Sequence, residues 1–374
     1  NLTVGQLFER LGFPMVRFLG QGDVNTTHAS PFHVQGNARG AMPLYKGEEV
    51  DHLIPLEYLP TRGPRGRTPF LAPQGDKAQT ASQRAALAEI RRLARLRAKE
   101  RGFVLHEVAK FRVPRRIAGT YFERGPRGRT PVFPHTLWVA ANLPEGIAKG
   151  LLGLLCSAPV NFAFHFCSTN NHVAMNLLAC LPVPERAITE LPALAALTTR
   201  ALDSGRILLK LFEEFGVDRS RALRADIPVV DPVTLLNRKG LLRVQALVWR
   251  ERGWLRLEAN ASLITRLTVK TLAERGALVA DGPRSTGEVL GLWLSAYGGC
   301  KWQELQGLDM PDDPTRYLQE WEASQQALRN AEACRTAAQQ AIDGAVADLY
   351  AIPVDLRDVL CVGPPWLAGQ PRAK

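Results

Sequence analysis

The stretch GLLGLLCSAPVNFAFHFCSTNNHVAMNLLACLPVPE, from Gly150 to Glu185, is the part of the chain around which the remainder is expected to be organised. It joins a long apolar run to the polar segment Ser168–His172 and ends on Leu-Pro-Val-Pro. Pro159, Asn161 and His165 interrupt the apolar part, whereas a membrane-spanning helix needs about 20 predominantly apolar residues. The sequence therefore predicts a buried helix that breaks and restarts near Pro159.

The polar segment Ser168–His172 is predicted to be a surface loop, because Ser, Thr and Asn side chains bond to nearby backbone groups and favour turns. Beyond it, Val173, Leu177 and Leu178 fall on one face of a second helix. Two prolines then end that helix and set an extended exit. We therefore expect the apolar helices to be buried and to hold the loop at the protein surface.

This order of features resembles the target-recognition region of large adenine-specific DNA methyltransferases, found in type IIG restriction-modification and in phage-defence systems such as BREX and DISARM. The matching pattern is LLGLLxS, an aromatic run, a small polar loop and HVxMxLLxxLPVP. Pro43–Glu48 is similar to the family's PLYxGK segment, and Ile342–Tyr350 to its closing helix. The family usually carries Asn-Ser where this chain has Cys156 and Ser157.

The resemblance implies a DNA-binding specificity module that acts with a methyltransferase domain on the same or another chain. S-adenosylmethionine would be the cofactor of that catalytic domain, and we expect no cofactor or metal in this chain. The chain starts at Asn1 without a methionine, and in the family a methyltransferase domain normally precedes this region. We expect a cytoplasmic protein, since no targeting peptide is visible.

Catalytic motifs are missing from the sequence. Methylation of a flipped adenine needs a Gly-rich FxGxG turn and a [DNS]PP[YFW] loop, but Asp231-Pro232 is followed by Val233. A GxSxG nucleophile elbow is also missing. We therefore expect recognition without catalysis.

Charge is unevenly distributed along the chain. The 374 residues carry a net charge of +11, yet 61–130 alone holds 18 basic and 5 acidic residues, which leaves the remainder slightly acidic. Concentrated basic charge binds phosphate backbones and steers polyanions. Duplex DNA is the partner that this pattern favours, and a solvated basic face without a partner is the alternative.

An eight-residue sequence occurs twice in this basic region. RGPRGRTP spans Arg62–Pro69 and recurs without change 62 positions later at Arg124–Pro131. Gly and Pro disfavour regular structure, so each copy is predicted to be an exposed loop whose glycines let guanidinium groups approach a phosphate. The residues expected to hold phosphates are Arg62, Arg65, Arg67, Arg124, Arg127 and Arg129.

Between the two copies, Ser82–Arg101 has the strongest helical pattern of the chain, and Gly102 is placed to end the helix. Its apolar stripe is narrow, and arginines crowd the remaining surface. An anionic membrane is a disfavoured partner because the apolar face lacks Trp and Phe. Further phosphate contacts are expected from Arg91, Arg92 and Arg95 on this helix and from Arg115 and Arg116 beyond it.

The polar loop is expected to read bases. Asn can pair with adenine through two hydrogen bonds, so base edges would be approached by Thr169, Asn170, Asn171, His172 and Asn176. The alternative function is a non-catalytic structural or RNA-binding subunit of a defence complex.

We predict an α+β fold, with a small β-rich recognition domain and a mainly helical C-terminal part. The expected segments are an N-terminal mixed α/β segment over 1–75, a basic helix with the recognition core over 76–186, and a helical spacer or docking domain over 187–374 with a short β segment near 226–260. The individual elements expected are helices over Val4–Leu11, Ile188–Phe215 and Tyr317–Leu349, and strands over Met15–Phe18, Phe103–Val108 and Thr136–Ala141.

Overall fold

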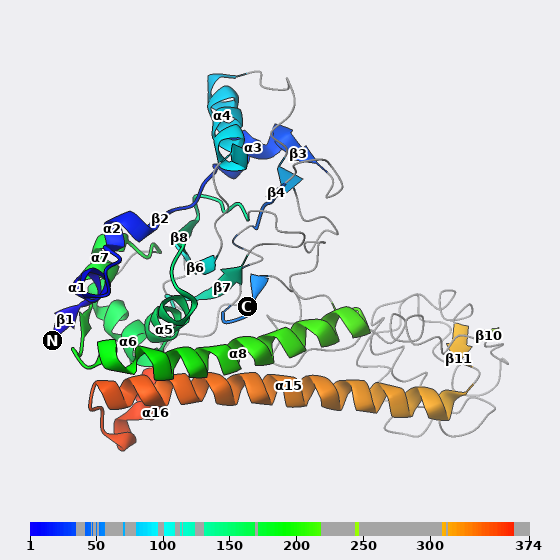
Figure 1. Cartoon of the computed structure of the whole chain (residues 1–374). Helices are drawn as coiled ribbons and strands as arrows, with labels where there is room; N and C mark the ends of the chain where they lie inside the picture. Colours follow the sequence, from blue (N-terminus) through cyan, green and yellow to red (C-terminus); the bar gives the residue numbers. More distant parts are fainter. Residues whose placement is uncertain are drawn as a thin grey trace, which may run out of the picture. The chain divides into compact units, whose positions relative to one another are not determined.

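The computed structural model forms two compact units, Asn1–Leu209 with Ala331–Lys374, and Lys210–Asn330. It describes residues 1–34, 42–45, 47, 50, 52–56, 70–71, 80–95, 101–108, 113, 115–123, 131–168, 171–217, 244–246, 309–311 and 313–362. The fold is α+β, as predicted, with a helical C-terminal part (Figure 1).

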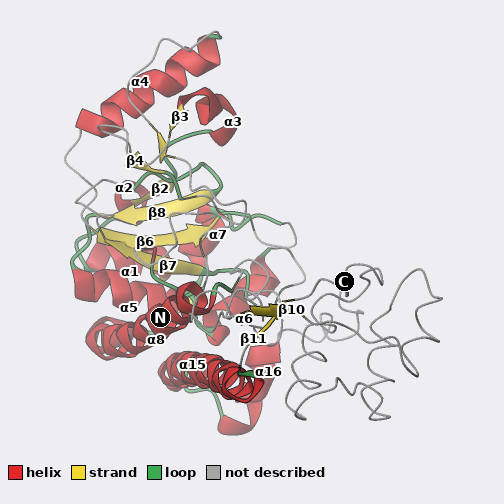
Figure 2. Ribbon diagram, turned by 90° about the vertical axis from the view of Figure 1, so that its right-hand side faces the viewer, coloured by secondary structure: helices red, strands yellow, loops and turns green. Residues whose placement is uncertain are grey.

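The first unit is built on a four-stranded antiparallel sheet in the order β2-β8-β6-β7 (Figure 2). The strands are β2 (Leu19–Gln21), β8 (Leu137–Ala141), β6 (Arg101–His106) and β7 (Gly119–Glu123). Gly102 pairs with Ala141 and Phe122. A Cβ at Gly102 would lie 1.8 Å from the Ala140 carbonyl oxygen, so only glycine permits this close approach of β6 to β8.

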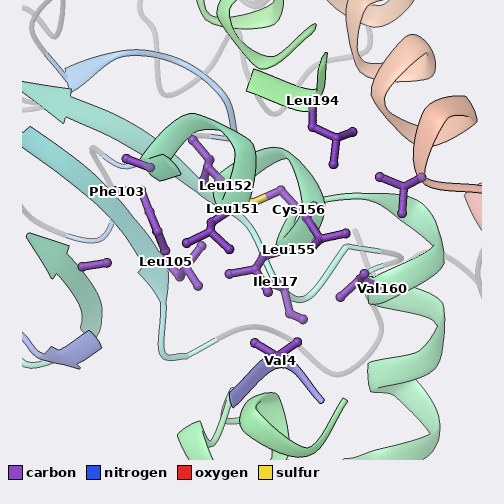
Figure 3. Close-up of a cluster of buried hydrophobic side chains, with 14 of the residues drawn as sticks. Val4, Phe103, Leu105, Ile117, Leu151, Leu152, Leu155, Cys156, Val160 and Leu194 are labelled. Atoms are coloured by element: carbon purple, nitrogen blue, oxygen red, sulfur yellow. The ribbon is translucent and has the colours of Figure 1, made fainter. Parts of the chain in front are cut away.

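The long apolar stretch forms the core beside this sheet. Helix α5 (Glu145–Leu155) contacts β6 and β7, and α6 (Ala158–Cys167) restarts after a break with Pro159 in its first turn. Figure 3 shows Leu151, Leu152 and Leu155 among side chains from the sheet and the N-terminal helix. The predicted buried helix that breaks near Pro159 is therefore confirmed.

The remaining N-terminal and exit elements pack around this core. Helix α1 (Val4–Arg10) begins with a capping box at Thr3, and α7 (Met175–Cys180) contacts this helix. Strand β9 (Pro182–Val183) is the predicted extended exit and pairs with β1 (Leu2–Thr3).

A second, three-stranded sheet has the order β3-β5-β4, from β3 (His33–Val34), β5 (Phe70–Leu71) and β4 (Met42–Pro43). Helix α3 (Thr26–Ala29) contacts η1 (Ser30–Phe32) and α4 (Ala81–Arg95), and apolar side chains of all three share a core with this sheet. The α4 side chains Leu87, Ile90 and Leu93 are buried in a separate core with Phe32, Leu44 and Leu71.

Two long helices form most of the C-terminal part. They are α8 (Ala187–Phe215), which ends before Gly216, and α15 (Pro314–Leu349). Within the first unit, Leu191, Leu194, Ile342 and Val346 join the main core. A Cβ at Gly153 of α5 would lie 2.2 Å from the Thr198 hydroxyl oxygen, so glycine there lets α8 approach α5 closely. The chain continues to η5 (Val354–Leu356) and α16 (Arg357–Val362).

In the second unit, β10 (Val244–Ala246) pairs with β11 (Asp309–Pro311). The remainder of the β segment expected near 226–260 lies outside the described residues. The expected three-segment division of the chain stays a prediction.

Two local predictions are wrong. Met15–Phe18 is helix α2 and not a strand, because the partner strand β8 pairs only from Leu19 onward. Arg101 and Gly102 open β6 and do not end the basic helix. The other predicted elements with described residues are confirmed to within a few positions.

Within the described ranges, no single helix is long and apolar enough to cross a membrane; α5 and α6 reach that length and composition only as a pair, bent by 59° at their break.

Candidate nucleic-acid interface

The polar loop Ser168–His172 is held at both of its described ends by Arg116. The Arg116 guanidinium donates to the Ser168 carbonyl at 2.7 Å and to the His172 carbonyl at 3.3 Å. It also lies over the Phe164 ring, 4.9 Å from the centroid. Arg116 is fully buried, and this burial lowers the pKa of its guanidinium. We call this arrangement the Arg116 clamp.

Neighbouring contacts hold the chain on either side of the clamp. The Trp138 indole N–H donates to the Val173 carbonyl at 2.6 Å, and the Val173 N–H donates to the Glu107 carbonyl at 2.6 Å. The buried Asn161 side chain accepts from the Ile117 N–H at 2.7 Å and donates to the Ile117 carbonyl at 3.1 Å. Hydrogen bonds therefore anchor the described chain on both sides of residues 169 and 170.

The structure contradicts the expectation that Arg116 holds a phosphate, because Arg116 has no exposed surface. A buried guanidinium that donates to internal carbonyls cannot also bind a phosphate outside. Arg115 is ion-paired with Asp343 and its side chain is 25% exposed, so its expected phosphate contact stays a prediction. From the sequence both arginines were expected at the surface, and Arg116 is instead part of the core.

Asp343 is the centre of a second polar network. Its Oδ1 atom accepts from the Ala158 N–H at 2.8 Å, from Arg115 Nη1 at 3.2 Å and from Gln339 Nε2 at 2.9 Å. Arg115 Nη1 also donates to the Cys156 carbonyl at 3.0 Å. The carboxylate thus fastens α15 to the start of α6, where the helix dipole favours negative charge.

Cys156 and Ser157, where the resembling family has Asn-Ser, are fully buried. Burial raises the pKa of the Cys156 thiol to about 12. The Ser157 hydroxyl donates to the Leu154 carbonyl at 2.7 Å. A protonated buried thiol and a bonded hydroxyl support packing here and not nucleophilic chemistry.

His52 extends this network and is held in its neutral form. His52 Nε2 lies 2.6 Å from Gln339 Oε1, and because Gln339 Nε2 donates to Asp343, the Gln339 oxygen must accept. The His52 proton is therefore on Nε2, and its buried Nδ1 has no hydrogen-bond partner among the described residues. Burial, together with the nearby Arg115 charge, lowers the pKa of His52 to about 3.

We expect stability to fall as the pH is lowered from 6.5 toward about 3, because the unfolded chain binds a proton at His52 in this window and the folded chain does not. The slope from this one group is at most about 1.4 kcal/mol per pH unit. Urea denaturation between about pH 4 and pH 7 checks this. His52→Gln keeps a donor toward Gln339 without titrating, so the same pH slope in both proteins would contradict the assignment.

Helix α4 presents its arginines to solvent. Arg84, Arg91 and Arg92 are exposed, whereas Leu87 and Ile90 of the same helix are buried. Arg92 is also paired with Glu89, whose Oε2 accepts from Arg92 Nε at 2.8 Å, and this pairing raises the pKa of Arg92. Arg95 is the last residue of the helix, and its side chain lies outside the described part. The basic helical face is therefore present, with Arg84 and Arg91 among its exposed cations.

Except for Pro131, the two RGPRGRTP copies lie outside the described residues, but the described residues that follow each copy contact the same strand. Phe70, just after the first copy, pairs with Pro43 of β4. Val132, just after the second copy, donates to the Pro43 carbonyl at 2.9 Å and accepts from the Tyr45 N–H at 3.0 Å. Adjacent strands lie about 4.8 Å apart. Segments 62 positions apart in sequence are therefore anchored on opposite sides of one strand.

The chain segments that lead into the two copies are also neighbours. The Leu53 N–H donates to the Gly119 carbonyl at 2.8 Å, and the Thr120 hydroxyl donates to the Ile54 carbonyl at 2.5 Å. Two consecutive residues of one segment thus meet two consecutive residues of the other. The described residues that flank the two copies therefore lie in one region of the molecule.

The remaining predicted site residues divide into two groups. Asn171, His172 and Asn176 are exposed, and His172 forms a β-bridge with Val108. The others lie outside the described residues, namely Arg62, Arg65, Arg67, Arg124, Arg127, Arg129, Thr169 and Asn170. The structure therefore brings Arg116 together with both described ends of the polar loop.

Sequence reasoning missed the clamp and the Asp343 network. The basic region drew attention to Arg116 as a phosphate contact, but only the packing of this segment against α6 shows that its side chain is buried. Comparisons of the chain with protein-family models, with curated proteins and with solved structures found no match.

Proposed function

We propose that this chain is a DNA-binding target-recognition module of an adenine-specific DNA methyltransferase or of a related restriction-modification or phage-defence system. The observation that carries the proposal is the exposed arginine face of α4, within the most basic part of the chain. Clustered arginines on one helix face supply phosphate affinity. The methyltransferase domain, with S-adenosylmethionine, would be supplied elsewhere in the system.

The Arg116 clamp supports a division of roles within the module. Phosphate contacts position a protein on DNA, whereas side chains at base edges select the sequence. Asn171 and His172 are exposed at the C-terminal end of the polar loop, where the buried Arg116 guanidinium donates to the His172 carbonyl. A loop whose ends are fixed loses less conformational freedom on binding, which favours a reading role.

The arginine face is tested by the double variant Arg84→Ala/Arg91→Ala. We expect weaker binding to every duplex and a shallower dependence of log affinity on log salt, by about 0.9 for each phosphate that the variant no longer neutralises. Fluorescence anisotropy over a salt series measures both quantities. The matched control is Arg316→Ala/Arg329→Ala, which removes two exposed arginines from α15 and should leave duplex binding nearly unchanged.

A second experiment, the selection of duplexes from a random pool, tests whether the polar loop recognises a base sequence. Asn171→Ala should change the selected sequence and leave the salt slope as it is. Equal affinity for all duplexes at every salt concentration would rule out sequence reading. Tighter binding to RNA than to DNA would support the alternative, an RNA-binding subunit of a defence complex.

A further inference from the structure

An exposed aromatic side chain lies just before the polar loop. Phe166 belongs to the last turn of α6, two positions before Ser168, and is 60% exposed. Among the side chains that the structure describes, it is the only exposed Phe, Tyr or Trp. Removing the apolar surface of such a ring from water is favourable. A partner that covers Phe166 would therefore gain binding free energy.

The packing of α6 holds this ring in place. The ring centroids of Phe162 and Phe166, one helical turn apart, are separated by 5.2 Å, and the ring planes are inclined by 56°. Phe164 and His165 of the same helix are buried. Their burial fixes the rotation of α6 about its axis, which leaves Phe166 at the surface. A side chain held in this way loses little conformational freedom when it binds.

The side chains expected to read bases are close to Phe166 along both described ends of the polar loop. The Ser168 hydroxyl donates to the His172 carbonyl at 3.5 Å, so the two ends lie side by side. Phe166 is two positions before one end, and Asn171 is one position before the other. Val108, which forms the β-bridge with His172, is itself 46% exposed. Apolar and polar groups are therefore exposed together at this loop.

The chemistry of base edges indicates what an apolar side chain can contact there. In the major groove, the groups that distinguish the four base pairs are hydrogen-bond donors and acceptors, with one exception, the 5-methyl group of thymine. Phe is among the side chains that contact this methyl group. An aromatic ring beside a loop that approaches base edges therefore finds its apolar contact at a thymine.

We propose that Phe166 contacts the methyl group of one thymine in the recognised DNA sequence and so favours an A·T pair at that position. The inference rests on the proposed function, and it adds an apolar contact to the polar ones expected from the loop. Asn171 would pair with an adenine in the same groove.

The test starts from the duplex sequence selected from the random pool. Each thymine is replaced in turn with deoxyuridine, which lacks only the 5-methyl group. We expect binding by the wild-type chain to weaken about fourfold at one position, the effect of removing one buried methyl group, and to stay unchanged at the others. Fluorescence anisotropy at one fixed salt concentration measures the affinities.

Variants of Phe166 identify the side chain that contacts the methyl group. Phe166→Ala should bind the thymine duplex more weakly and should no longer distinguish thymine from deoxyuridine, which completes a double-mutant cycle across the interface. Phe166→Leu keeps an apolar side chain and should retain part of the difference. The matched control is Val16→Ala, which shortens an exposed apolar side chain of α2 and should respond to deoxyuridine as the wild type does. Equal thermal melting of the variants confirms that each is folded.

The possible outcomes separate the two proposals. The thymine contact is overturned, and the DNA-binding module left standing, if no position responds to deoxyuridine or if Phe166→Ala shows the same fourfold response. A selection that yields no preferred sequence, or one without an A·T pair, also overturns the contact. Weaker binding by Phe166→Ala without a deoxyuridine response in the wild type would indicate insertion of the ring between base pairs instead. Failure of the wild-type chain to bind any duplex overturns both proposals.

Discussion

Replacing Arg116 with methionine is expected to lower the free energy of unfolding by about 3–5 kcal/mol, because two hydrogen bonds from a charged group to carbonyls are lost and each such bond contributes about 1.5–3 kcal/mol. Methionine fills much of the volume but donates no hydrogen bond. The Ser168 and His172 carbonyls would lose their donor, and the Phe164 ring would lose the guanidinium stacked on it. Urea denaturation measures the change.

Arg116→Lys separates charge from shape. Lysine keeps the positive charge but lacks the planar fork that reaches both carbonyls and lies flat on a ring, so we expect it to restore little of the stability. Arg91→Met, at an exposed arginine of α4, is the control and should stay within about 0.5 kcal/mol of the wild type. A wild-type-like stability of Arg116→Met would show that the clamp is not structural.

The second large effect is expected at Asp343. Asp343→Ala removes the acceptor of Arg115, of Gln339 and of the Ala158 N–H, and leaves the guanidinium of Arg115 without its carboxylate. We expect a decrease of about 3–5 kcal/mol in the free energy of unfolding. We also expect the α15 segment to detach from α6 more often in this variant. Amide hydrogen exchange along Ala331–Leu349 would detect this as reduced protection.

Glu332→Ala is the matched control on the same helix. Glu332 pairs with Arg335 one turn away, with both side chains partly exposed, and such pairs contribute little. Its stability should lie within about 0.5 kcal/mol of the wild type. If Asp343→Ala and Glu332→Ala behaved alike, the Asp343 network would not be what fastens α15.

Local sequence patterns were sufficient for most elements. The apolar run with Pro159 predicted α5 and α6, and the helix predicted over Ile188–Phe215 is α8, which ends before Gly216. These features act through neighbours along the chain, namely helical periodicity, a fixed proline φ and a glycine φ of +65° at Gly216. Gly102 was misjudged because a glycine after a helical pattern and a glycine in a tight strand pair look the same in sequence.

The candidate site was predictable only in part. Charge composition and the polar loop pointed to a nucleic-acid surface, and the α4 arginines are exposed as expected. Arg115 and Arg116 were assigned to that surface because sequence reports that a residue is charged, but not which way its side chain points.

By itself the sequence determined the helices, the basic region, the repeated RGPRGRTP segment and the α+β class, because each depends on composition or on residues a few positions apart. Only the tertiary structure decided which arginines are buried, that both repeats are anchored at β4, and that Asp343 reaches Arg115. These depend on contacts between residues up to 228 positions apart. Burial turns the same guanidinium group from a surface cation into a structural donor, and burial is a property of the folded chain.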